Sequence, residues 1–183
     1  MKRTFDICMA ALGLVLTAPL LAIISVLIKL DSHGPVIFRQ IRVGQGFRPF
    51  AIRKFRTMVV DASGAGLPLT VGQDSRITRI GQILRKCKLD ELPQLWNVLI
   101  GDMSFVGPRP EVPRYVERLQ SEFSEVLTVR PGITDLASLR YIYEASILAY
   151  SSNPEEEYQL KVLPEKVRLA KFYIRHMSLR LDL

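Results

Sequence analysis

The sequence predicts an α+β protein that is mainly helical, with a membrane-inserted helix at its N-terminus, amphipathic helices at the membrane surface and a small β element around a compact core. Three observations predict it: an uncharged run at 7–28, strand-like segments between 36 and 52, and apolar residues at helical spacing after 76. A length of 183 residues suits one domain plus an appendage. We therefore expect the membrane helix at 1–30 and the folded domain at 31–183.

The N-terminal run contains 22 consecutive residues without a charge. As a helix it would be about 33 Å long, close to the hydrocarbon thickness of a bilayer. A secretory signal peptide is a poorer match, because Asp6 follows the basic residues Lys2 and Arg3 directly and no A-x-A cleavage site closes the run. This segment is expected to enter lipid.

Pro19 lies near the middle of the run, where it removes the backbone hydrogen bond to the carbonyl of Val15 and favours a kink. Basic residues flank both ends, with Lys2 and Arg3 before the run and Lys29 after it. The positive-inside tendency therefore draws both ends to the cytoplasm, which favours a re-entrant helix broken at Pro19. A plain spanning helix stays open, because such helices tolerate proline.

The segment after the membrane helix begins with a turn at 31–35 and continues in strand-like material from 36 to 52. A loop is predicted at 61–74, which contains three glycines and a proline. The last sixty residues have a helical pattern, interrupted at Pro131-Gly132. Asn153-Pro154, followed by three glutamates, predicts a helix N-terminus.

A basic amphipathic helix is predicted between the loop and the acidic pair at 90–91. Its apolar positions are Ile77, Ile80, Ile83, Leu84 and Cys87, and its basic positions are Arg79, Arg85, Lys86 and Lys88. The helix could cover a soluble core with a solvated basic face, or it could lie at the level of the lipid headgroups. Both interpretations remain open, and such helices could also pack on a second copy in a homodimer.

The charge balance of 25 Lys and Arg against 18 Asp and Glu gives +7 and favours an anionic partner. We expect no nucleic-acid partner, because nucleic-acid binding does not explain the apolar run and no aromatic-basic platform is present. Cys8 and Cys87 have neither C-x-x-C spacing nor a nearby histidine, which indicates reduced packing residues.

The residues best suited to chemistry lie at 85–111, where Asp90 and Glu91 are adjacent and Arg85 and Arg109 flank them. A carboxylate can attack phosphorus or hold Mg²⁺ against phosphate oxygens. The arginines could neutralise a transferring phosphoryl group, and the prolines on either side of Arg109 restrict its backbone. Alternatively, Asp90 could be the N-cap of a helix whose first turn contains Pro93. These residues alone leave both roles open.

The block LDELPQLWNVLIGDMSFVGPRP closely resembles the hallmark block of the bacterial sugar transferases, the monotopic phosphoglycosyl transferase family. The resemblance extends through RTFDICMAALGLVLTAPLLAII, GPVIFRQIRVG and KFRTM, and downstream to VRPGITDLAS, so that it covers most of residues 1–138. It implies a small catalytic core of this family. The implied location is the bacterial inner membrane, with residues 31–183 forming the catalytic domain on the cytoplasmic face.

The resemblance also implies a reaction and roles for particular residues. Asp90 would be the nucleophile that takes a sugar phosphate from a UDP-sugar and releases UMP, with Glu91 as its partner and Mg²⁺ held at Asp90. Polyprenyl (undecaprenyl) phosphate would then accept the sugar phosphate. Lys54, Arg85 and Arg109 match phosphate-binding positions.

Two departures from the family pattern affect what can be carried over. Many members have Ser-Pro where this chain has Ala18-Pro19, and the segment DLASLRYIYEASILAY replaces a tryptophan and polar run. Arg130 and Arg140 are therefore only candidates for nucleotide or sugar contacts, and residues 139–183 receive no role. The main alternative function is a non-catalytic, membrane-anchored scaffold or regulator that docks on anionic lipid.

Overall fold

A computed structural model of the protein describes residues 2–60 and 74–182. The α-helices are α1 (Lys2–Asp31), α2 (Arg79–Lys86), α3 (Gln94–Ile100), α4 (Pro113–Arg118), α5 (Gln120–Val126), α6 (Leu136–Arg140), α7 (Glu144–Ala149), α8 (Pro154–Glu157), α9 (Leu163–His176) and α10 (Leu179–Asp182). Short helical turns are η1 (Gln45–Phe47), η3 (Leu89–Glu91) and the π-helical η4 (Tyr158–Val162). The strands are β1 (Ile37–Val43), β2 (Pro49–Phe55), β3 (Ser104–Val106) and β4 (Gly132–Thr134).

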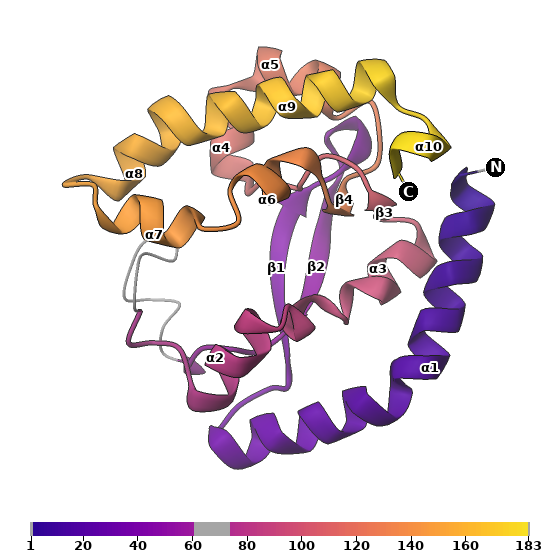
Figure 1. Ribbon diagram of the computed structural model, residues 1–183, viewed down its shortest axis with the longest axis vertical. Helices are drawn as coiled ribbons and strands as arrows, with labels where there is room; N and C mark the ends of the chain where they lie inside the picture. Colours follow the sequence, from indigo (N-terminus) through magenta and orange to yellow (C-terminus); the bar gives the residue numbers. More distant parts are fainter. Residues whose placement is uncertain (1, 61–73, 183) are drawn as a thin grey trace.

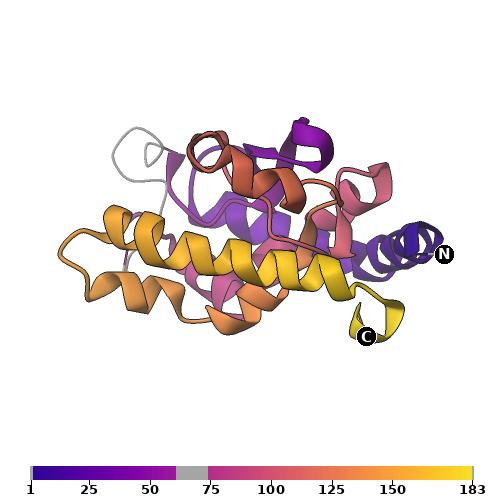
Figure 2. The ribbon, with the colours of Figure 1, turned by 90° about the horizontal axis from the view of Figure 1, so that it is seen from above.

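The long helices α1 and α9 border the molecule, and the β1–β2 hairpin lies between them (Figure 1). From above, α9 runs across the molecule toward the end where α1 begins (Figure 2). Both views place the two termini side by side, in agreement with an ion pair between Lys2 and Asp182. The predicted mainly helical architecture with small β elements is thus confirmed, while the loop predicted at 61–74 falls almost entirely outside the described residues.

Helix α1 remains helical through Pro19 and is bent midway (Figure 1). Proline lacks the N–H that would continue the hydrogen-bond ladder, and the Thr17 hydroxyl donates to the carbonyl of Gly13 at 2.6 Å, a contact that also bends helices. Val15 and Leu16 are 73% and 69% exposed. By length and composition α1 could cross a membrane, and most of its apolar surface is not covered by protein.

The first turn of α1 is fastened to the segment from α3 to β3. Arg3 donates to the carbonyls of Val98 and Leu99, at 2.6 and 3.0 Å, and so satisfies groups that the end of a helix leaves unpaired. The buried Asp6 carboxylate accepts from the Ser104 hydroxyl at 2.9 Å. These contacts hold the N-terminal end of α1 against the folded domain.

The last turn of α1 is fastened to the same domain through different residues. The buried Arg56 guanidinium donates to the carbonyls of Ser32 and His33 at 2.6 and 2.7 Å. Asp31 accepts from the backbone N–H of Ile80, at the start of α2, at 3.1 Å. Both ends of the apolar helix are therefore anchored on one folded body.

The β1–β2 hairpin is antiparallel and pairs Ile37 with Phe55 and Val43 with Pro49. Its position is set by the fully buried Asn97 of α3. The Asn97 side chain accepts from the Arg53 backbone N–H at 3.0 Å and donates to the Ala51 carbonyl at 2.9 Å. Because side chains alternate along a strand, this contact decides which face of β2 each side chain occupies.

The buried hydrophobic residues form separate clusters, which join different sets of helices and strands. Ala10 of α1 packs with Ile52 and Val98, while Ile24 and Ile28 pack with Phe55 and Leu84, so the hairpin, α2 and α3 share a core with α1. A separate cluster joins α4 and α5 to η4 and α9. This second cluster gives the C-terminal residues a packed place in the fold.

Two local predictions can be compared with the structure. Asn153 caps α8 by accepting from the Glu156 backbone N–H, which confirms the predicted helix N-terminus. The helical pattern was predicted to be interrupted at Pro131-Gly132. In the structure a short strand, β4, begins at Gly132 and pairs in parallel with β3. A three-residue strand has too little periodicity to be recognised in a sequence.

Replacing Asn97 with alanine should lower the free energy of unfolding by about 2–4 kcal/mol, because the backbone groups at Ala51 and Arg53 lose buried hydrogen-bond partners. The measurement is chemical denaturation in detergent. The exposed helix cap Asn153→Ala is the matched control and should cost about 1 kcal/mol or less. Equal losses in the two variants would contradict the role assigned to Asn97.

Candidate active site

The acidic pair lies in a tight turn between two helices. Helix α2 ends at Lys86, and Lys88 adopts a left-handed conformation with φ 57°, which reverses the chain into η3. Leu89 packs into the core beside α2. This geometry presents Asp90 and Glu91 from a short helical turn whose neighbours are fixed by packing.

Glu91 is held between two cations from distant parts of the sequence. Its Oε1 accepts from Lys54 Nζ of β2 at 2.6 Å and from Arg109 Nη2 at 2.8 Å. Burial alone would raise the pKa of Glu91, but the attraction of Arg109 and Lys54 outweighs it and holds the pKa well below its usual value. Glu91 is therefore ionised and organises the cluster.

Lys54 and Arg109 are only partly covered, with side chains 20% and 33% exposed. Burial and the neighbouring Arg109 lower the pKa of Lys54 to about 8, although Glu91 opposes the shift. For Arg109 burial acts to lower the pKa, and Glu91 more than offsets it, so the net shift is upward. Both cations remain accessible to an anion arriving from solvent.

No residue in the ranges 2–60 and 74–182 donates a hydrogen bond to Asp90 in the way that Lys54 and Arg109 donate to Glu91. Asp90 is 9% exposed, and its Oδ1 accepts no hydrogen bond from any residue that the structure describes. Helix α3 begins at Gln94 after Pro93, so the alternative role of Asp90 as its N-cap is wrong. Burial raises the pKa of Asp90, while Lys54 favours the ionised form.

Arg85 approaches the pair from α2. Its Nε donates to the Thr57 hydroxyl at 2.8 Å, and its charge acts on Asp90. Gly81 permits this docking, because a Cβ there would lie 2.2 Å from the carbonyl oxygen of Thr57. The structure thus brings together the acidic pair and the three cations that were predicted to bind phosphate, which are Lys54, Arg85 and Arg109.

The turn that carries Arg109 depends on a close backbone approach. A Cβ on Gly132 would lie 2.2 Å from the backbone nitrogen of Gly107, so the two backbones can approach this closely only with glycine at 132. The Arg109 backbone N–H donates to Asp135 at 3.2 Å, and Asp135 also caps α6 through Ser138. Sequence reasoning did not identify Asp135, although the D-x-x-S spacing is a capping signal.

A buried polar network supports the same turn from the C-terminal half. Tyr158 donates its hydroxyl to Glu111 at 2.7 Å, and Arg42 donates to the carbonyl of Pro110 at 3.1 Å. Burial and the nearby Glu111 raise the pKa of Tyr158. Residues 139–183 had no predicted role. They contribute the Tyr158 side chain, which bonds to Glu111 two residues after Arg109.

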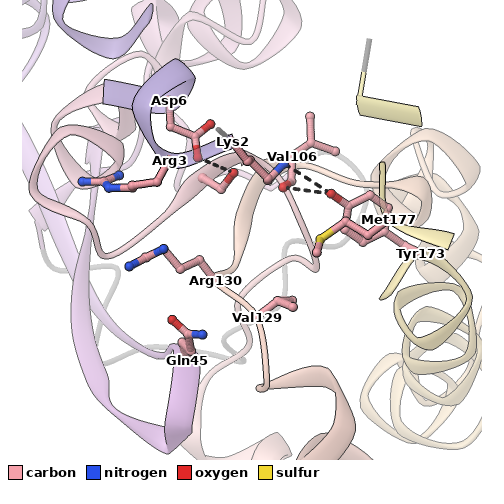
Figure 3. Close-up of a pocket in the computed structure, with 10 residues that line it drawn as sticks. Lys2, Arg3, Asp6, Gln45, Val106, Val129, Arg130, Tyr173 and Met177 are labelled. Carbon is pink, nitrogen blue, oxygen red and sulfur yellow. Dashed lines mark hydrogen bonds between the residues drawn. The ribbon is translucent and has the colours of Figure 1, made fainter. Parts of the chain in front are cut away.

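The two arginines suggested for nucleotide or sugar contacts do not join this cluster. Arg130 donates to the Gly101 carbonyl at 3.0 Å and lines a pocket of about 200 Å³. Figure 3 shows it there with Arg3, Lys2 and Gln45. Arg140 ends α6 and is exposed.

A Mg²⁺ site can be tested against the same residues. In the ranges 2–60 and 74–182, no group of three or more acidic, histidine or cysteine side chains could enclose a metal. No described residue donates a hydrogen bond to Oδ1 of Asp90, whereas Lys54 and Arg109 both donate to Glu91. That donor set fits Mg²⁺, which proteins commonly bind through one or two carboxylates together with substrate phosphates and water.

Known proteins resemble the chain over most or all of its length. The family of bacterial sugar transferases matches residues 1–183. A UDP-N-acetylgalactosamine-undecaprenyl-phosphate N-acetylgalactosaminephosphotransferase of Aeromonas hydrophila is 39% identical across 99% of the chain and 40% of the relative. A UDP-glucose:undecaprenyl-phosphate glucose-1-phosphate transferase of Caulobacter vibrioides is 46% identical across 76% of the chain and 53% of the relative.

The chain thus spans roughly half the length of these two relatives. The exopolysaccharide production protein PSS of Rhizobium leguminosarum is 45% identical across 76% of the chain and 74% of the relative. The match over every residue, together with the acidic pair and its cations, shows that the chain belongs to the bacterial sugar transferase family of enzymes.

Proposed function

We propose that the protein transfers a sugar 1-phosphate from a UDP-sugar to undecaprenyl phosphate through a covalent intermediate on Asp90. The observation that carries this proposal is the contrast within the acidic pair: Glu91 pairs with two cations, whereas no described residue donates a hydrogen bond to Oδ1 of the buried Asp90. The names of the Aeromonas and Caulobacter relatives supply the donor and acceptor classes. Such a reaction would begin membrane-bound glycan synthesis.

In the first step an Asp90 oxygen forms a bond to the sugar-proximal phosphorus of the UDP-sugar. The bond from that phosphorus to the bridging oxygen breaks, and UMP leaves with the oxygen and its electron pair. Burial removes water from Asp90, which strengthens electrostatic interactions around the reacting group. The sugar phosphate is then held as a mixed anhydride of Asp90.

In the second step a phosphate oxygen of undecaprenyl phosphate attacks the same phosphorus. The bond between phosphorus and Asp90 breaks, its electrons return to the carboxylate, and undecaprenyl diphosphosugar is released. Lys54, Arg85 and Arg109 would stabilise the negative charge on the phosphoryl oxygens in both steps. Glu91 keeps Lys54 and Arg109 in place before substrate arrives.

Asp90 would also hold Mg²⁺, together with oxygens of the pyrophosphate. When bound, the ion supplies positive charge that offsets the charge on the leaving UMP. The side chains then have separate tasks: Asp90 binds the reacting phosphorus, and the cations around Glu91 orient the phosphate groups.

We further propose that α1 enters and leaves the inner membrane on its cytoplasmic face. Both ends of α1 are bonded to one folded body, through Arg3 and Asp6 at one end and Arg56 at the other. A helix that crossed the bilayer would have to release one set of these contacts. The bend at mid-helix makes a shallow path through one leaflet possible.

Asp90→Asn should abolish UMP release from the UDP-sugar, with a loss on the order of 10³-fold or more, because an amide does not replace the nucleophile. The assay uses purified protein in detergent with Mg²⁺, undecaprenyl phosphate and either UDP-glucose or UDP-N-acetylgalactosamine. Mass spectrometry without acceptor should find the sugar phosphate on the peptide that contains Asp90. Glu117→Gln, on an exposed position of α4, is the charge-matched control.

Full activity in Asp90→Asn would remove Asp90 from the nucleophile's role. Wild-type protein that binds anionic lipid but releases no UMP with any UDP-sugar would instead favour the membrane scaffold.

The rate of the first step should fall as the pH rises through about 8, because Lys54 then loses the proton that makes it a cation. Below that pH the cation is present. In Lys54→Arg the charge persists, so the alkaline limb of kcat/KM for the UDP-sugar should move to higher pH. An identical limb in both proteins would show that another group titrates.

Single cysteines at position 4, in the first turn of α1, and at position 33, just after α1, should both resist a membrane-impermeant maleimide added outside intact cells. Both should react once the inner membrane is permeabilised. The native Cys8 and Cys87 are exposed and are first replaced by alanine. Labelling of one end alone from outside would mean that α1 crosses the bilayer.

A further inference from the structure

The pocket in Figure 3 lies where the first turn of α1 meets η1, the segments around β3 and β4, and the end of α9. Its volume is about 200 Å³. We call it the N-terminal pocket, and its polar lining includes Lys2, Arg3, Asp6, Gln45 and Arg130. The cations that bond to Glu91 do not line it, so the N-terminal pocket is separate from the acidic pair.

Two of the three cations in the N-terminal pocket have no acidic partner. Lys2 pairs with Asp182, but the side chains of Arg3 and Arg130 donate to backbone carbonyls at the C-terminal end of α3. Within residues 2–60 and 74–182, neither arginine forms a salt bridge. The pocket therefore holds two positive charges that are balanced only by the partial charges of carbonyl oxygens.

The carboxylates around the N-terminal pocket are already bonded. Asp6 is buried and accepts from the Ser104 hydroxyl at 2.9 Å. Asp182 accepts from Lys2 and from the Tyr173 hydroxyl, two side chains that line the pocket. A ligand with a single anionic group fits this charge pattern, whereas the ammonium group of a zwitterion would find no carboxylate partner among the described residues.

Arg130 and Gln45 have hydrogen-bonding groups available to a ligand. Arg130 bonds to Gly101 through Nε, and its two Nη groups donate to no residue in the described part of the chain. A guanidinium group with such N–H groups binds phosphate oxygens in a bidentate manner. Gln45 donates its amide nitrogen to the Thr128 carbonyl at 2.8 Å, while its Oε1 accepts from no described residue. In Figure 3 the Arg130 side chain lies between Arg3 and Gln45.

An exposed apolar stripe leads away from the N-terminal pocket along the first arm of α1. Residues three and four apart lie on the same face of a helix, and from Lys2 this spacing leads through Phe5, Met9, Leu12 and Leu16. All four apolar side chains are exposed, from 41% for Met9 to 69% for Leu16. A cationic pocket at the end of an apolar stripe suits an amphiphile that has an anionic head and a hydrocarbon chain.

We infer that the N-terminal pocket binds an anionic phospholipid of the phosphatidylglycerol class, with its phosphate on Arg3 and Arg130 and an acyl chain on the stripe from Phe5 to Leu16. The Oε1 of Gln45 would accept a hydrogen bond from the headgroup glycerol. This inference rests on the proposed function, because the path proposed for α1 brings its first turn to the level of the headgroups. The lipid is neither donor nor acceptor in the transfer, and it would hold the first turn of α1 at the bilayer surface.

The test measures lipid binding by native mass spectrometry of the purified protein in detergent micelles. The protein is titrated with phosphatidylglycerol or with phosphatidylcholine of the same chain length. We expect phosphatidylglycerol to bind about tenfold more tightly or better, because its headgroup carries no cation. Arg130→Gln should weaken its binding about fivefold, and the double variant with Arg3→Gln about 25-fold.

Arg79→Gln is the matched control, because Arg79 is an exposed arginine of α2 that lies outside the N-terminal pocket. It should leave the affinity for phosphatidylglycerol unchanged, and Arg130→Lys should recover part of the loss. Thermal unfolding of each variant checks the fold. If Arg3→Gln releases the first turn of α1, Arg130→Gln alone decides the test.

Three results would overturn the inference. An equal loss in Arg79→Gln would mean that the overall positive charge attracts the lipid, and unchanged binding in the double variant would exclude the two arginines. Glycerol phosphate, which has the phosphate without the acyl chains, should bind far more weakly; if it bound as tightly, the pocket would be a site for soluble phosphate compounds. These measurements need neither turnover nor a bilayer, so a negative result leaves the transfer reaction standing, and a protein that released no UMP would still bind the lipid.

Discussion

The buried side chain of Asn97 is the contact on which the arrangement of the site depends. By bonding both the carbonyl of Ala51 and the N–H of Arg53, it fixes the register of β2 against α3. A shift of one residue would turn every β2 side chain to the opposite face. Lys54 would then leave Glu91, so one amide decides where this lysine lies.

The acidic pair illustrates how adjacent residues acquire different chemistry from their surroundings. Glu91 has a lowered pKa because two cations reach it, whereas burial raises that of Asp90. The sequence shows only two neighbouring carboxylates. The surroundings, which β2 and the Arg109 turn supply, give Glu91 two cationic partners, while no described residue donates a hydrogen bond to Oδ1 of Asp90.

The sequence predicted helices where the apolar pattern was long, as in α1 and α2, and it predicted the strand-like material of the hairpin without its pairing. It also brought together Asp90, Glu91, Arg85 and Arg109, which lie within one segment. It could not reveal contacts between distant segments: Asn97 with β2, Asp135 under Arg109, or Tyr158 behind Glu111. Asn97 and Tyr158 have no local pattern that distinguishes them from ordinary polar residues, and the capping signal at Asp135 does not reveal its bond to Arg109.

The anchoring of α1 also constrains the order of events during synthesis. The partners of Arg3 and Asp6 lie between Val98 and Phe105, so the first turn of the helix cannot reach its final contacts until the ribosome has made roughly the first half of the chain. The helix is therefore made before the residues that fix its first turn. The final position of α1 is thus coupled to the folding of the segment from α3 to β3.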